Sequence, residues 1–133
     1  MTGRQIAVLA ARIADEKRGG EIVVYDLRGL SDVTDYFVIV TVMARLQARA
    51  VVHAIERGLR GQGVRMLGME GGPASQWILL DYGDVVIHVF SPRLREYYSL
   101  ESLWGDAPKV AWQEGAPDAV PSPPQGQAPV EQQ

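Results

Sequence analysis

Asp81 and Asp84 flank the Tyr82-Gly83 dipeptide between two strongly apolar segments, and they are the closest acidic pair on a plausible strand end. Carboxylates directly opposed across a hairpin repel each other unless a cation lies between them. Such a pair can hold Mg²⁺, bond an arginine of the same fold, or meet a basic partner. It can also have no function beyond accepting turn amides and facing water. The pattern alone leaves these four alternatives open.

Phosphoryl transfer is the chemistry that a metal-holding acidic pair would serve. It needs two or three carboxylates around the phosphate oxygens, usually beside a glycine-serine loop. No Gly-Ser loop precedes an Asp-x-Asp pattern in this chain. Glu70-Gly71-Gly72-Pro73 precedes a strand and opens no helix, so it offers no helix N-terminus to an anion and is read as a turn. We therefore predict a protein that is not an enzyme and has neither a metal nor a cofactor.

The two histidines offer no catalytic alternative. By strand alternation His88 shares a face with Trp77, which favours a stacked, hydrogen-bonded structural histidine, although its charge can change near neutral pH. His53 lies in the middle of an expected helix, without a second ligand at i+4 or the adjacent Glu of metalloprotease helices. We expect His53 to be partly buried against a neighbour, and neither histidine to bind zinc.

Two segments rich in β-branched and aromatic residues, 77–80 and 85–90, predict a hairpin around Gly83. If Tyr82-Gly83 is its two-residue loop, the opposed pairs on one face are Asp81 with Asp84, Leu79 with Val86, and Trp77 with His88. The other face is aliphatic and is expected to be core. The first face is too polar for a dry core and too apolar for a free surface, so we expect it to contact a partner.

The elements that position this hairpin follow from hydrophobic periodicity and from glycine and proline stops. Their expected order is helix, two strands, helix, three strands, helix. The long helix is the expected crossover of a partly parallel sheet, and the hairpin adds an antiparallel pair. We therefore predict an α/β fold with a mixed five-stranded sheet and flanking helices. The expected bounds are a helix from Ile6 to Arg18, strands at 21–27 and 36–41, a helix at 44–61, a strand at 64–69, the two hairpin strands, and a last helix capped by Ser91 with Pro92 in its first turn.

Length and composition limit the chain to one domain with one core, since it has 133 residues with 47% hydrophobic composition. It contains no cysteine, which excludes disulfides and thiolate metal sites. The N-terminus lacks the apolar run of a signal peptide, and no window approaches a membrane span, so we expect a cytoplasmic protein without a transit peptide and without membrane contact.

Residues 105–133 differ in composition from the rest of the chain. They hold six of the eight prolines, five glutamines and all of the net charge of −3. We interpret this segment as a disordered tail whose removal from residue 113 onward leaves stability and binding unchanged, although Val110 to Trp112 are able to dock locally. Residues 1–104 then form the domain. Because that domain is neutral overall, we expect little direct nucleic-acid binding and a basic protein as its partner.

The last helix is rich in large side chains. Leu94, Leu100 and either Tyr97 or Tyr98 can form its core stripe at helical spacing. The other tyrosine then faces outward. Aromatic residues and Arg are the commonest interface anchors, so this helix is expected to contribute to the contact surface.

The run W-I-L-L-D-Y-G-D-V-V-I-H-V-F, followed by R-E-Y-Y-S-L-E-S-L-W, resembles the signature of the ribosomal silencing factors, or Iojap-like proteins. Thr34-Asp35-Tyr36-Phe37-Val38-Ile39 is similar to the first conserved strand of that family, and the likeness extends from about Gln5 to Trp104. One segment departs from it: the family usually has Gly-Thr-Ser-Ser-Arg-His/Gln where this chain reads Val42-Met43-Ala44-Arg45-Leu46-Gln47. Only Gln47 fits.

The resemblance implies a small α/β fold of nucleotidyltransferase-like architecture and an interaction protein that docks on the large ribosomal subunit. It implies ribosomal protein fourteen of that subunit as the partner and a steric block to joining of the small subunit. The alternative is a nucleotide-handling enzyme on a related fold. A face that is apolar when unbound also predicts a homodimer of the free protein. The residues expected at the contact are Trp77, Asp81, Tyr82, Asp84, His88, Arg95 and Tyr98.

Overall fold

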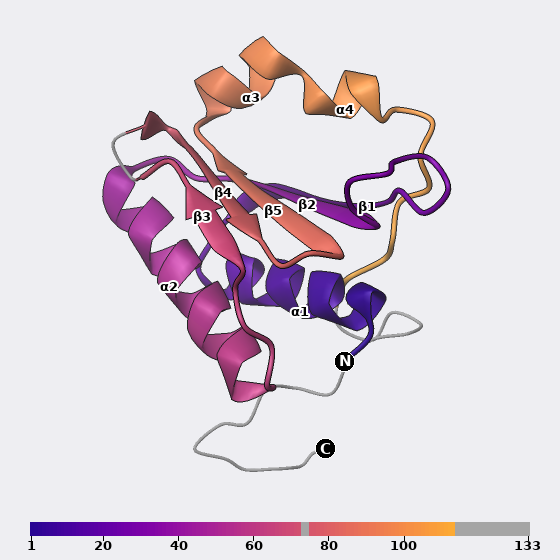
Figure 1. Ribbon diagram of the computed structural model, residues 1–133. Coiled ribbons are helices and arrows are strands. Elements are labelled where there is room, and N and C mark those ends of the chain that lie inside the picture. Colours follow the sequence, from indigo (N-terminus) through magenta and orange to yellow (C-terminus); the bar gives the residue numbers. More distant parts are fainter. Residues whose placement is uncertain (73–74, 114–133) are drawn as a thin grey trace.

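The β-branched segments assemble into a single mixed sheet in the computed structural model, which describes residues 1–72 and 75–113 (Figure 1). The strand order is β1-β2-β5-β4-β3. Only β2 and β5 are parallel neighbours, and the other three pairs are antiparallel. The predicted mixed five-stranded sheet is therefore confirmed. The strands are β1 Gly20–Asp26, β2 Tyr36–Thr41, β3 Gly68–Glu70, β4 Trp77–Asp81 and β5 Val85–Phe90.

Two long helices cover one face of this sheet, and two short helices cross the other (Figure 1). The long pair packs the main core between α1, α2 and the sheet. The short pair closes a second, smaller cluster around Ile39 and Phe90. In chain order the helices are α1 Gly3–Glu16, α2 Arg45–Gly61, α3 Pro92–Tyr98 and α4 Leu100–Leu103.

Local sequence explains where these helices begin and end. A reciprocal capping box between Thr2 and Gln5 starts α1. The Ser91 hydroxyl accepts the Leu94 N–H at 3.2 Å and Pro92 follows it, so the predicted start of α3 is confirmed. By contrast, Ala44 caps α2 without any side-chain hydrogen bond, which is where the chain departs from the family pattern.

The hairpin lies where the sequence predicts it, but its register differs. Asp81 is opposite Val86, and Leu79 is opposite His88. The loop is Gly83-Asp84, with Gly83 at φ +83° in its first position, as in a type II′ turn. Asp81 and Asp84 are therefore not opposed, and the predicted pairing of Trp77 with His88 is wrong as well. The faces are unchanged because the pairing shifts by two residues.

The predicted last helix is two helices. Ser99 adopts the left-handed conformation, φ 49° and ψ 48°, between α3 and α4. This break turns the chain so that Leu94, Leu100 and Trp104 all pack against the second cluster. The predicted core positions of Leu94 and Leu100 are confirmed.

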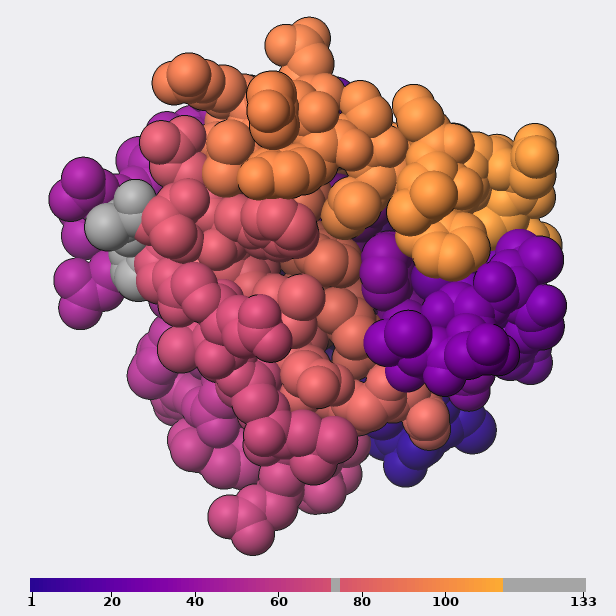
Figure 2. All heavy atoms as spheres, turned by 45° about the horizontal axis from the view of Figure 1, so that its top comes forward, coloured from indigo at the N-terminus to yellow at the C-terminus, as the bar shows by residue number. Residues whose placement is uncertain are grey.

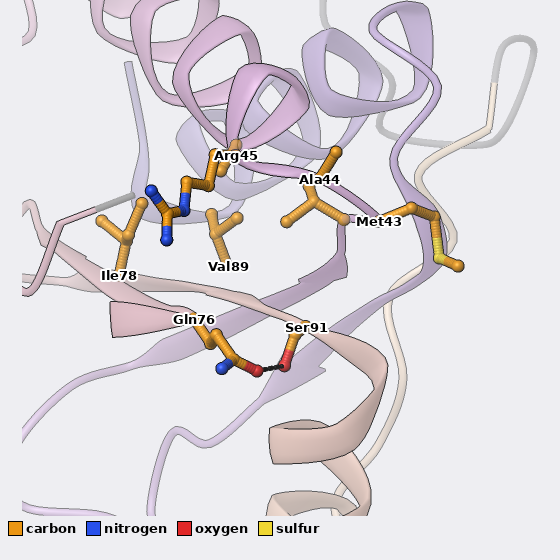
Figure 3. A pocket seen from close by; sticks show the side chains of 9 residues that line it. Met43, Ala44, Arg45, Gln76, Ile78, Val89 and Ser91 are labelled. Atoms are coloured by element: carbon orange, nitrogen blue, oxygen red, sulfur yellow. Dashed lines mark hydrogen bonds between the residues drawn. The ribbon is translucent and has the colours of Figure 1, made fainter. Parts of the chain in front are cut away.

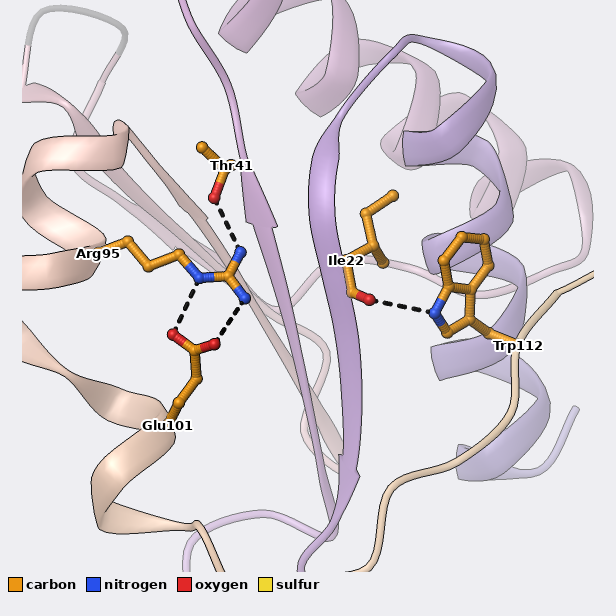
Figure 4. Close-up of polar contacts among 5 residues, drawn as sticks. All are labelled: Ile22, Thr41, Arg95, Glu101 and Trp112. Atoms are coloured by element: carbon orange, nitrogen blue, oxygen red, sulfur yellow. Dashed lines mark hydrogen bonds and ion pairs between the residues drawn. The ribbon is translucent and has the colours of Figure 1, made fainter.

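The folded chain also continues past the expected boundary at Trp104. Residues 107–112 form a strap along β1: Val110 N–H donates to the Val24 carbonyl at 2.8 Å, and Asp26 N–H donates to the Pro108 carbonyl at 2.8 Å. Trp112 Nε1–H donates to the Ile22 carbonyl at 3.2 Å (Figure 4). The tail expected beyond the strap lies outside the described residues.

Candidate functional site

The sheet face beneath α3 and α4 carries a chain of aromatic contacts. Trp77 on β4 lies 4.9 Å from Phe90 and 4.8 Å from Tyr98, measured between ring centroids. His88 on β5 lies 4.7 Å from Phe37, edge to face. Strand alternation projects these β4 and β5 side chains to the same side, and α3 adds Tyr98 from above. The cluster fixes α3 over the hairpin.

His88 is the polar centre of this cluster. Its Nδ1 accepts the Trp77 indole N–H at 3.1 Å, which places the imidazole proton on Nε2. Nε2 has no hydrogen-bond partner, and the residue is buried. Burial lowers the pKa of His88 to about 4, so the ring is neutral at pH 7. The predicted stacked, hydrogen-bonded histidine is confirmed. Its expected contact with a partner stays a prediction, and the ring is only 4% exposed for such a contact.

Arg95 joins α3, α4 and the sheet. Its Nε and Nη2 donate to the two oxygens of Glu101 at 3.0 Å each, and its Nη1 donates to the Thr41 hydroxyl at 2.8 Å (Figure 4). These hydrogen bonds are the main reason why the pKa of Glu101 is lowered. We call this arrangement the Arg95 clasp. Arg95 itself is buried, so its guanidinium is engaged inside the fold, and its predicted contact with a partner stays a prediction.

Tyr82 does not lie on this face of the sheet. It is buried on the opposite face of the hairpin, in the main core under α1 and α2, where burial raises the pKa of its hydroxyl to about 12. A side chain in that position cannot meet a partner at the α3 side of the sheet.

Four of the seven predicted contact residues keep exposed surface. Trp77 and Asp81 are half-buried, while Asp84 and Tyr98 are exposed. Asp81 Oδ1 accepts the Gly83 N–H at 2.8 Å, so this carboxylate has the turn-capping role considered among the alternatives. Asp84 lies at the same end of the hairpin.

A groove of ≈ 370 Å³ lies between β4 and α3. Figure 2 looks onto this side of the molecule, with the hairpin below the α3–α4 layer. Gly71 bounds the groove at φ +80°, and a Cβ there would overlap the Trp77 carbonyl oxygen, so the turn requires glycine. We call this feature the docking groove; its lining residues are Glu70, Gly71, Ser75, Trp77, Leu79, Leu94 and Tyr98.

A second hollow, of ≈ 270 Å³, lies at the N-terminus of α2 (Figure 3). Arg45 reaches over it toward Ile78, and the Ser91 hydroxyl donates to Gln76 Oε1 at 3.0 Å on its other side. It carries no carboxylate and no histidine. Within residues 1–72 and 75–113, no group of three His, Asp or Glu side chains is placed to hold a metal ion.

Sequence reasoning missed Thr41 and Glu101 as partners of Arg95. In one continuous helix, positions 95 and 101 would lie about 120° apart around the axis and more than one turn apart along it, so no such contact is expected. The break at Ser99 is what brings them together. His53 was also misplaced: it is exposed on α2 and not partly buried.

Known proteins resemble this chain over nearly its whole length. The family model described as "Ribosomal silencing factor during starvation" matches residues 2–133. The ribosomal silencing factor RsfS of Bacillus subtilis is 41% identical over 108 residues, covering 81% of this chain and 92% of that protein. The mouse "mitochondrial assembly of ribosomal large subunit protein 1" is 36% identical over 74 residues, covering 53% of this chain and 32% of that protein. A crystal structure of a Chromobacterium violaceum protein superposes with a TM-score of 0.75 at 31% identity, covering 89% of this chain and 98% of that one.

Proposed function

The chain belongs to the ribosomal silencing factor family, and from this premise we propose that it binds the large ribosomal subunit and blocks joining of the small one. The partner in this proposal is ribosomal protein fourteen of the large subunit. The relatives are named as silencing factors, and the mouse relative is named for assembly of the large subunit. Steric blocking requires affinity and bulk, with no catalytic group, cofactor or metal. We also propose that the protein acts in the cytoplasm, where the ribosomes are.

The docking groove is the observation that carries this proposal. Trp77, Leu79 and Tyr98 give it a half-exposed apolar floor and wall, while Glu70 lies at its rim. Interfaces concentrate their binding free energy in such aromatic positions, which are surrounded by polar groups. Asp81 and Asp84 stand at the hairpin end of the same strands, where a basic protein surface supplies the matching charge. His88 and the Arg95 clasp act by positioning these groups, since both are buried.

Adjacent tyrosines provide a matched test of the groove. Tyr98 lines it and is 48% exposed, whereas Tyr97 is 77% exposed and is not among its lining residues. Tyr98→Ala should weaken binding to purified large subunits by about tenfold or more, and Tyr97→Ala should change it little. Co-sedimentation with each purified subunit measures both. Binding of the unmodified protein to small subunits as well as large ones would contradict the proposal.

The acidic end of the hairpin has its own test. Asp81→Asn combined with Asp84→Asn removes both charges, while the Asn oxygen at 81 can still accept the Gly83 N–H. Charged contacts that become desolvated lose roughly 2 to 5 kcal/mol when one side is removed, so affinity for the large subunit should fall by more than about tenfold. The matched control is Asp15→Asn with Asp106→Asn, two exposed positions outside the groove. Equal losses in both double variants would show a general effect of charge.

We further propose that the free protein pairs through the docking groove, so that dimer formation and ribosome binding compete. Tyr98, which lines the groove and is 48% exposed, supports this proposal, because a large aromatic side chain in an apolar groove favours contact with another protein surface. A symmetric contact would hide the same side chains that the ribosome covers.

A further inference from the structure

The solvent side of α2 carries a row of arginines and one histidine. Arg45, Arg49, His53 and Arg57 follow one another at intervals of four residues, and Arg60 lies on the same side. All five are exposed. We call the four arginines with His53 the arginine face. At 1.5 Å per residue it extends about 18 Å from Arg45 to Arg57.

This row is a local concentration of charge in a neutral domain. All thirteen Lys and Arg and thirteen of the sixteen Asp and Glu lie in residues 1–113. Within that balance, α2 holds four arginines and one acid, Glu56, whose carboxylate pairs with Arg60 at 3.0 Å. No acidic group of the described residues forms an ion pair with Arg45, Arg49 or Arg57. Although the domain is neutral overall, this face therefore has about three positive charges without an acidic partner among the described residues, on Arg45, Arg49 and Arg57.

The arginine face is separate from the docking groove. α2 lies against the sheet face opposite α3 and α4 (Figure 1), and its apolar side, including Val51, Ile55 and Leu59, is buried in the main core. A partner seated in the groove leaves the outer side of α2 free. The two surfaces can therefore contact different components of one assembly.

We propose that the arginine face binds the phosphate backbone of ribosomal RNA beside the protein on which the groove docks. This inference rests on the proposed function. Guanidinium groups bind phosphate oxygens through paired N–H donors, and a row of them matches a row of backbone phosphates. A lipid surface fits less well, because α2 already buries its apolar side and exposes only Leu46 as a large apolar group.

The salt dependence of binding tests the phosphate contact. Arg49→Gln with Arg57→Gln removes two phosphate partners, and Arg93→Gln with Lys109→Gln is the control with the same change in charge at exposed positions elsewhere. The slope of log affinity for large subunits against log salt should become shallower by about 1.4 to 1.8 in the first variant only. Equivalently, between 50 and 200 mM salt the unmodified protein should lose about ten times more affinity than the arginine-face variant. Equal slopes in all three proteins would overturn the proposal.

Directed cleavage identifies the contacted component, because the chain has no cysteine to compete with an introduced one. A tethered Fe(II) chelate on His53→Cys should cut large-subunit RNA at a local set of nucleotides, whereas the same probe on Ser102→Cys of α4 should leave those nucleotides intact. Binding to large subunits without RNA cleavage from position 53 would overturn this inference. A crosslinker attached at the same cysteine that reached only an acidic protein would also overturn it. Either result would leave the proposed function unaffected. Absence of binding to large subunits would overturn both.

Discussion

At the scale of single residues, buried polar groups hold the docking groove in shape. The imidazole of His88 accepts the indole N–H of Trp77, and Trp77 in turn lies between Phe90 and Tyr98. A neutral His88 is a condition for this arrangement, because a proton on Nδ1 would replace the acceptor of the Trp77 N–H with a second donor. The groove therefore depends on the protonation state of a side chain that it does not expose.

This dependence predicts a loss of stability in mild acid. The folded pKa of His88, about 4, lies below the value of 6.5 for a free histidine. The unfolded chain therefore binds more protons between these values, and the stability present above pH 6.5 is lost as the pH falls toward 4, by roughly 3 kcal/mol in total. Urea unfolding at pH 7, 6 and 5 measures it. His88→Gln should flatten the profile, and His53→Gln, at an exposed position, should not. An unchanged slope in His88→Gln would assign the effect to other groups.

The Arg95 clasp gives a second prediction at this scale. Arg95→Gln leaves the Thr41 hydroxyl and the Glu101 carboxylate without the guanidinium, and the free energy of unfolding should fall by about 1 to 3 kcal/mol. The loss is moderate because water reaches the Glu101 side chain, which is 41% exposed. Arg93→Gln, two residues earlier in α3 and exposed, should stay within about 0.5 kcal/mol of the unmodified protein. Arg95→Lys should recover little of the loss, since a point charge cannot replace the planar fork.

At the scale of elements, strands were easier to predict than their pairing. The bounds of β2 and β5 follow from β-branched residues ending at polar or glycine positions, and both predictions are confirmed. The hairpin register was wrong because Gly83 supplies positive φ at either loop position. Only packing distinguishes the two registers. In the observed register Tyr82 extends the strand and is buried, whereas in the predicted register Tyr82 would be a loop residue and would need positive φ. The break at Ser99 and the strap depend on tertiary contacts, which the local sequence pattern does not predict.

Composition alone assigns the strap to a disordered tail, whereas its contacts predict that it stabilises the domain. Ending the chain at Gln113 keeps every strap contact described above, and thermal stability should be close to that of the full chain. Ending it at Gly105 exposes the β1 edge and removes Val110 and Trp112 from the main core. We expect the melting temperature to fall by several degrees, consistent with a loss of about 2 kcal/mol or more. Equal melting temperatures for both truncations would show that the strap is not part of the folded unit.

At the scale of the whole molecule, the charges separate into two regions. The hairpin end carries Asp81 and Asp84, and the outer side of α2 carries the arginine face. No described helix is long and apolar enough to cross a membrane. The overall composition gave no indication of this separation, because its positive and negative residues nearly cancel.

The proposed dimer is also tested on the whole molecule. Trp77→Glu is a poor variant for this purpose, since Trp77 is packed in the second cluster and would destabilise the fold. Tyr98→Glu is better because the side chain is half exposed, and it should give a folded monomer at tens of micromolar that no longer binds large subunits. Tyr97→Glu is the control, and light scattering measures the mass. A monomeric unmodified protein at the same concentration would count against the dimer.

The two edges of the sheet differ in whether they are covered, and this difference limits how many copies can associate edge to edge. The strap pairs with β1, whereas β3 pairs only with β4 in the described part of the chain. If two copies paired through their β3 strands, each copy would use its one unpaired sheet edge. A third copy would find no place to add. Edge-to-edge association of this fold therefore ends at two molecules, and a chain shortened to lose the strap would be able to grow into longer polymers.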